Sequence, residues 1–213
     1  MQPYLRSITE GELIQLLKNI PKFVRFSNTY ISFNPNFRPA DILPLKHIWE
    51  NGDLRISFGS RFHPTPEIAR TLTNCSYLDL SPAGNGAVLV LSDLLSGKCQ
   101  KVSIWDYRYT ATTMKVPWEK IVDYLFGPTG TPHLYINTIH PPERQQCLEF
   151  TENVKQKFAD ATNALSFKFH WYLINGNQVL LPEFNKQNRQ NKQCLVLKSD
   201  ARKFELSIES REI

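Results

Sequence analysis

Four segments of the chain have apolar residues at the three- and four-residue spacing of an amphipathic helix. They run from Thr9 to Ile20, from Thr65 to about Asn74, from Pro117 to Phe126, and from Pro141 to about Thr162. Thr9 and Glu12 have the Thr-x-x-Glu spacing of a capping box. In the longest segment, the buried face is expected to contain Cys147, Phe150, Val154, Phe158 and Ala161. A shorter helix fits Leu45 to Glu50, so the pattern predicts four or five helices.

Shorter apolar runs, bounded by turn residues, predict about eleven strands. Hairpins are expected to join Lys22–Phe26 with Tyr30–Asn34, Gly86–Leu91 with Cys99–Tyr109, and Leu165–Ile174 with Gln178–Phe184. The last pair is separated by Asn175-Gly176-Asn177, and an Asn-Gly step suits the positive φ of a tight turn. The other strands are expected at Leu54–Gly59, Ser76–Leu80, His133–Thr138, Cys194–Lys198 and Lys203–Glu209.

These elements predict an α+β fold, with a largely antiparallel sheet or sheets built from hairpins and the four or five helices packed on one side. A doubly wound nucleotide-binding fold is disfavoured, because strands and helices do not alternate regularly and no G-x-G-x-x-G sequence opens a helix. No segment has the composition of a linker. Residues 1–213 are therefore expected to form a single globular domain.

Composition supports an ordinary globular protein, since 41% of the 213 residues are hydrophobic and 21% are charged. No apolar run is long enough to cross a membrane, and charged residues interrupt the first twenty positions, where a signal peptide would be apolar. The four cysteines are Cys75, Cys99, Cys147 and Cys194, and no two have C-x-x-C spacing. The expectation is a protein of a reducing, cytoplasmic compartment, with no cofactor and no membrane span.

The net charge of +5 is concentrated near the C-terminus. Between Asn185 and Lys203 lie six of the 25 Lys and Arg residues and one of the 20 Asp and Glu residues, which leaves 19 of each sign elsewhere. Asn185–Gln193 is entirely polar, so it has no apolar surface to bury against the cost of ordering. We expect a mobile loop at the edge of the sheet, able to contact phosphates, or else a solvated hairpin loop without a ligand.

Period-2 alternation in the strand before this tract separates two sets of side chains. Phe167, Phe169 and Trp171 would face the core, while Lys168, His170 and Tyr172 would form a wet surface with two rings and a cation. Bases can stack on such a strand face. A second candidate stripe, Trp105, Tyr107 and Tyr109, has the same alternation, and in both stripes the alternative is that the rings pack in the core.

Catalytic and metal-binding patterns are weaker. Cys75 with His133 or His140 could form a nucleophile and base if the fold brought them together, but no motif surrounds Cys75. His133, His140 and Cys147 are evenly spaced, yet their expected positions on a strand, in a loop and on a helix do not make one metal site. No metal site is predicted.

The sequence thus favours a binding protein that contacts a polyanion, most plausibly RNA or single-stranded DNA. The candidate nucleic-acid-binding residues are Lys168, His170, Tyr172, Lys186, Arg189, Lys192, Lys198, Arg202 and Lys203. Two alternatives remain open. One is a hydrolase or transferase that depends on a cysteine or histidine, and the other is a protein-interaction component, such as a viral or effector protein.

Overall fold

The computed structural model describes residues 9–21, 29–33, 45, 47–48, 54–58, 65–72, 77–80, 88, 90–97, 99–106, 115–128, 131–175 and 180–210. Its helices are α1 (Glu10–Lys18), α4 (Pro66–Leu72), α5 (Leu91–Leu94), α6 (Trp118–Leu125) and α7 (Arg144–Asp160). Its strands are β1 (Thr29–Phe33), β2 (Leu54–Phe58), β3 (Tyr77–Leu80), β4 (Lys101–Asp106), β5 (His133–Thr138), β6 (Lys168–Leu173), β7 (Phe184–Asn188), β8 (Gln193–Ser199) and β9 (Lys203–Ser210). The presence of both helices and strands confirms the expected α+β class.

All nine strands belong to one mixed sheet, in the order β1-β2-β3-β4-β5-β6-β9-β8-β7. The strands β1 to β6 lie side by side in sequence order, and each is parallel to the next. Beyond β6 the sheet continues with β9, β8 and β7, and these three pairings are antiparallel. Two differently constructed halves therefore share the strand β6.

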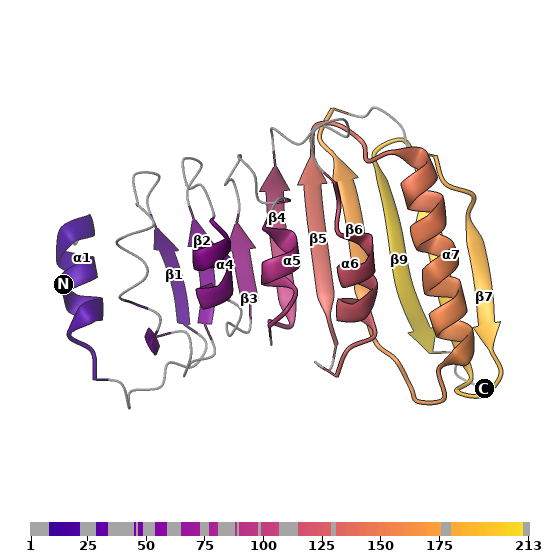
Figure 1. The fold of residues 1–213 in the computed structure, drawn as a ribbon, viewed down its shortest axis with the longest axis horizontal. Coiled ribbons are helices and arrows are strands. Elements are labelled where there is room, and N and C mark those ends of the chain that lie inside the picture. The colour runs from indigo at the N-terminus through magenta and orange to yellow at the C-terminus, as the bar shows by residue number, and fades with distance from the viewer. Residues whose placement is uncertain are drawn as a thin grey trace, which may run out of the picture.

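Helices connect the parallel strands and cover one face of the sheet. In chain order α4 follows β2, α5 follows β3, α6 follows β4 and α7 follows β5. Figure 1 shows these four helices in front of the sheet, with α1 beside the β1 edge. The expectation that helices pack on one side is therefore confirmed for α4, α5, α6 and α7.

The hairpin expected between Gly86–Leu91 and Cys99–Tyr109 is wrong, whereas Lys22–Phe26, the first strand of the other hairpin expected in the N-terminal half, lies outside the described residues. Five of the eight pairings are parallel, so "largely antiparallel" holds only for the C-terminal strands. Leu91, predicted to end a strand, instead starts the helix α5, which carries the chain across to β4. The strand β6 has β9 as its antiparallel neighbour rather than a strand at residues 178–184. Turn residues indicate where an element ends, but they do not determine whether the next element is a strand or a crossover helix.

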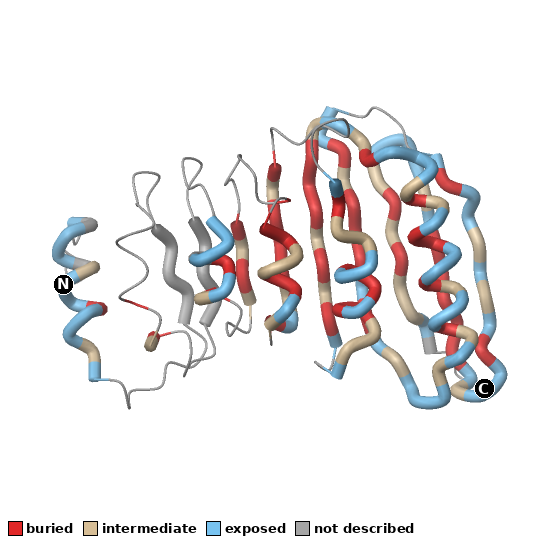
Figure 2. Tube along the Cα trace, in the orientation of Figure 1, coloured by how far each residue is buried: buried red, intermediate tan, exposed pale blue. Residues whose placement is uncertain are grey.

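The core lies between the sheet and its helices. Leu78, Val102, Ile104, Leu134 and Ile136 are fully buried, and Figure 2 shows the buried positions concentrated along the central strands and on the inner sides of the helices. The expected buried face of α7 is confirmed for its members Cys147, Phe150, Val154 and Phe158. Ala161 is the C-cap and is partly exposed.

Local sequence signals explain the helix boundaries. The Thr9 hydroxyl accepts from the Glu12 amide, and the Glu12 carboxylate accepts from the Thr9 amide at 2.9 Å, which completes the expected capping box. The Thr9 hydroxyl also lies 2.7 Å from the same carboxylate oxygen, and the hydrogen bonds that the carboxylate accepts from the Thr9 N–H and hydroxyl lower the pKa of Glu12. Among the described helices, none is both long enough and apolar enough to cross a membrane.

Candidate functional site

The polar tract Asn185–Gln193 forms one end of a hairpin, not the mobile loop that its composition predicted. It comprises most of β7, a turn at residues 189–192 and the first residue of β8. Asn188 is buried, and its amide donates to the carbonyls of Phe158, at 2.5 Å, and Ala161, at 2.8 Å, at the C-terminus of α7. The amide of Gln193 donates to the Leu165 carbonyl and its oxygen accepts from the Leu165 N–H, both at 2.7 Å.

These hydrogen bonds give the physical reason for the correction. The Asn188 and Gln193 amides bond to backbone groups at the end of α7 and in the following loop, among them the Phe158 carbonyl, which also accepts from the Ala161 N–H. The tract is polar because it closes the end of a helix, and composition alone does not distinguish this role from disorder.

The basic residues of this segment are also spread over separate surfaces. Lys186 lies on the helix side of β7, because Phe184 and Asn188, two positions before and after it, contact α7. Arg189 and Lys192 lie in the β7–β8 turn, at the end of the sheet where the parallel strands begin. Arg202 lies in the β8–β9 turn at the opposite end, roughly 20 Å away along β8. The prediction of one basic C-terminal surface is therefore wrong.

The remaining two lysines of the segment face acidic neighbours. Lys198 lies 3.7 Å from Glu209, and Lys203 lies 3.3 Å from Glu205. The hydrogen bond to Glu205 raises the pKa of Lys203. Both positive charges are thus partly compensated within the sheet.

The expected alternation along β6 is confirmed. Phe167, Phe169 and Trp171 are buried in the core, and Lys168, His170 and Tyr172 occupy the opposite face. In the neighbouring strands, the register places further polar and aromatic residues on that face. We call this surface the polar face; its described members on β3 to β6 and β9 are Tyr77, Asp79, Lys101, Ser103, Trp105, His133, Tyr135, Asn137, Lys168, His170, Tyr172, Lys203, Glu205, Ser207 and Glu209.

Rings and ammonium groups form a continuous ladder across the polar face. The Lys101 Nζ lies 4.6 Å from the centre of the Tyr77 ring and 5.4 Å from that of Tyr135. Tyr135 stacks on His170, with centroids 4.7 Å apart, and His170 lies parallel to Tyr172 at 5.8 Å. At the far end, the Lys203 Nζ lies 6.0 Å from the Tyr172 ring.

This ladder changes the role expected for His170 and Tyr172. One face of the His170 ring is stacked on Tyr135, and the Tyr172 hydroxyl lies 3.3 Å from its Nδ1, so a base cannot insert between these rings. The ring edges, hydroxyls and ammonium groups remain as contact groups. The polar face is thus better suited to bind phosphates, carboxylates or sugars than to intercalate bases.

His170 is the most enclosed titratable group of the polar face. Its side chain is 9% exposed, its Nδ1 lies 3.6 Å from a Glu205 carboxylate oxygen and 3.3 Å from the Tyr172 hydroxyl, and its buried Nε2 has no hydrogen-bond partner among the described residues. Burial lowers the pKa of His170, and the nearby Glu205 carboxylate opposes this effect only in part. The ring is therefore held neutral at pH 7.

A row of basic residues lies next to the ladder. Lys101, His133 and Lys168 are the first residues of β4, β5 and β6 and are register partners on adjacent strands. The register neighbours at the two ends of the row are Tyr77 and Ser207, neither of which is acidic. Burial and the positive charges of Lys168 and Lys101 lower the pKa of His133. The row is a local concentration of positive charge.

The catalytic candidates do not form a site within the described residues. Cys75 lies outside them, and so do Tyr107 and Tyr109 of the second aromatic stripe. His133 begins β5 and His140 lies beyond its end, which separates them by more than about 15 Å. Burial raises the pKa of both Cys99 and Cys147 to about 12, which disfavours the reactive thiolate. No three His, Cys, Asp or Glu side chains of the described part could share a metal ion.

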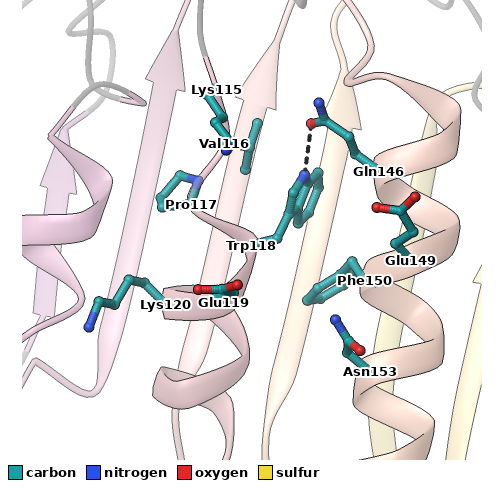
Figure 3. A pocket seen from close by; sticks show the side chains of 10 residues that line it. All are labelled: Lys115, Val116, Pro117, Trp118, Glu119, Lys120, Gln146, Glu149, Phe150 and Asn153. Atoms are coloured by element: carbon teal, nitrogen blue, oxygen red, sulfur yellow. Dashed lines mark hydrogen bonds between the residues drawn. The ribbon is translucent and has the colours of Figure 1, made fainter.

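A groove of about 490 Å³ lies on the helix side of the sheet, between the start of α6 and the middle of α7. Figure 3 shows Trp118 and Phe150 at its base, with Lys120, Glu119 and Glu149 around it. The Trp118 indole donates to Gln146 at 3.1 Å across the groove. No histidine or cysteine lines the groove, so it does not contain the cysteine–histidine pair expected for the hydrolase or transferase alternative.

Comparisons with protein-family models, with curated proteins and with solved structures found no match to this chain. The site is therefore defined by its geometry alone. Sequence reasoning missed Tyr77, Lys101 and Tyr135, and considered His133 only as a catalytic residue or metal ligand. The alternation within β4 and β5 could have placed these residues on one face, but only the parallel register shows that the two strands are neighbours.

Proposed function

We propose that this protein binds a polyanion, single-stranded RNA or DNA, through the polar face of its sheet. The observation that supports the proposal best is the row Lys101, His133 and Lys168, which has no acidic register partner. Neutralising phosphates with such residues releases counterions and favours binding. Tyr135 and Tyr172, which adjoin the row, offer hydroxyl groups for hydrogen bonds to phosphate or sugar.

The proposed contacts are mainly to the nucleic-acid backbone. Since the stacked rings leave no gap for a base, binding should depend little on sequence. Of the residues first considered, Lys168, His170, Tyr172, Lys198 and Lys203 belong to this surface or adjoin it. Lys186, Arg189, Lys192 and Arg202 lie elsewhere and are not part of the proposed site. A cytoplasmic location is included in the proposal, and it is supported by the buried thiols of Cys99 and Cys147.

The test uses two double variants that remove the same charge. Lys101→Gln with Lys168→Gln changes the row, whereas Lys186→Gln with Arg189→Gln changes residues away from the polar face. We expect the first pair to weaken binding of a labelled U20 RNA and to reduce the slope of log K against log salt by about 1.4, at ~0.7 per phosphate contact of a single strand. The second pair should leave both quantities unchanged. Fluorescence anisotropy at several salt concentrations measures them.

Equal losses in the two variants would place the contacts outside the polar face. Absence of salt-dependent RNA or DNA binding by the unmodified protein would remove the proposal altogether. If U20 fails to bind while an acidic polypeptide such as polyglutamate binds through Lys101 and Lys168, the ligand is an acidic protein instead.

A further inference from the structure

The Lys101, His133 and Lys168 row is compact enough to surround a single anion. Adjacent strands are about 4.8 Å apart, so the three residues span roughly 10 Å of backbone. The long lysine side chains flank the imidazole on either side and can converge toward one group. Three basic residues this close together can bind one phosphate group. Residues that contact successive phosphates separately would instead be distributed along the sheet.

The backbone beneath the row is fixed from the helix side. The hydroxyl of Tyr124, on α6, is buried and lies 2.9 Å from the carbonyls of both Cys99 and Gln100, just before Lys101. The His133 N–H donates to the Gln100 carbonyl at 2.7 Å. On the polar face, the Lys101 ammonium is held between two tyrosine rings. The basic groups are thus positioned before a ligand arrives.

The acidic residues of the polar face do not neutralise the row. Asp79 lies two residues after Tyr77, Glu205 two residues before Ser207 and Glu209 two residues after it, so none is a register partner of the row, and Glu209 lies 3.7 Å from Lys198. Glu205 already contacts Lys203 at 3.3 Å and His170 at 3.6 Å. The charged or titratable groups that face His133 are therefore Lys101 from β4, Tyr135 from its own strand, and Lys168 and His170 from β6.

Charge favours a dianion over a monoanion at this position. Two lysines provide permanent positive charges, and the half-buried His133 can provide a third by taking up a proton when a negative charge approaches. A phosphate monoester carries close to two negative charges at neutral pH, because its second pKa is about 6. A phosphodiester carries one. The row also lies at the amino ends of β4, β5 and β6, at the border of the polar face. A bound single strand of nucleic acid would end at this border rather than cross it.

We propose that Lys101, His133 and Lys168 form a subsite for a phosphate monoester, which anchors the bound single strand by a terminal phosphate. This inference rests on the proposed function for the identity of the ligand. The rest of the strand then extends along the polar face toward Tyr172 and Lys203.

The experiment compares three U10 oligonucleotides: one with a 5′-phosphate, one with a 3′-phosphate and one with hydroxyl groups at both ends. We expect one of the phosphorylated oligonucleotides to bind roughly fivefold more tightly than the unphosphorylated one at pH 6.5. That ratio should fall to about one in Lys168→Gln and in His133→Gln. Lys203→Gln, also on the polar face, should leave the ratio unchanged whatever its effect on overall affinity.

A second measurement is independent of RNA binding. In a titration with inorganic phosphate followed by NMR, the His133 ring signals should shift and the pKa of His133 should rise, and Lys168→Gln should weaken both effects. If oligonucleotides bind but the three bind equally, the subsite is wrong and the proposed function stands. If no oligonucleotide binds but His133 responds to phosphate, the subsite stands and the proposed function is wrong. If the His133 ring signals do not respond to phosphate and the three oligonucleotides bind equally, the proposed subsite is wrong.

Discussion

His170 shows how the fold changes the chemistry of one side chain. In the unfolded chain its pKa is near 6.5, whereas in the folded protein it is enclosed by Tyr135 and Tyr172 and its pKa is lowered by burial. The folded state therefore favours the neutral ring. By linkage, the unfolded state binds more protons than the folded state once the pH falls below 6.5.

The prediction is that His170 contributes a pH-dependent part of the stability. Its contribution is complete above pH 6.5 and is lost as the pH falls toward the lower pKa of the folded state. In His170→Phe, which keeps a ring but removes the titration, the free energy of unfolding should fall less between pH 7.5 and pH 5.5 than in the unmodified protein. Urea unfolding at the two pH values measures this difference. An identical fall in both proteins would show that His170 is not held neutral.

Side-chain placement along single strands could be predicted from the sequence because it depends only on the period of two. The separation of Lys168, His170 and Tyr172 from the core residues of β6 is confirmed. The contacts of His170 with two tyrosines, one of them stacked on its ring, could not be predicted in this way. One of those tyrosines, Tyr135, comes from β5, and its proximity depends on the parallel register.

The boundaries of some helices and strands could also be predicted from the sequence, where they depend on short local patterns. The capping box at Thr9, the strand His133–Thr138 and the buried face of α7 follow from short patterns, and the structure confirms them. The strand expected at Gly86–Leu91 is wrong at its described positions, because Val88 and Val90 lie in turns and Leu91 starts α5. The polar hairpin of β7 and β8 was misinterpreted because its amides bond to α7, which lies far away in the sequence.

This explanation of the polar hairpin predicts a specific effect of substitution. Asn188→Asp places a carboxylate against the carbonyls of Phe158 and Ala161, to which the amide of Asn188 donates. The loss of two buried hydrogen bonds should lower the free energy of unfolding by about 2–3 kcal/mol, as measured by urea unfolding. Hydrogen exchange should increase in the last turn of α7. Arg189→Gln, the neighbouring exposed residue, is the control and should change neither measurement.

Across the whole molecule, one hydrophobic cluster includes residues from α1, from the parallel strands and from β8 and β9. Trp118 and Trp171 lie within or against this cluster in the half that contains β5 and β6. That the chain behaves as a single domain stays a prediction. It implies that secondary structure is lost together with the environment of these tryptophans.

The measurement compares two probes of unfolding in urea. Far-UV circular dichroism follows all helices and strands, and tryptophan fluorescence is dominated by residues whose environment changes on unfolding, among them Trp118 and Trp171. We expect the two transitions to coincide, with a common midpoint and slope. Two separate midpoints would show that the parallel and antiparallel halves unfold independently.

The strand order has a consequence for a chain that is still being synthesised. The strands β1 to β6 can pair in the order in which they leave the ribosome, because each lies beside its predecessor. The outer side of β6, in contrast, stays unpaired until β9 has been translated, while β7 and β8 emerge before β9 and have no sheet to join. During this interval the nascent protein presents a bare strand edge, the kind of surface that recruits chaperones or pairs wrongly with another chain.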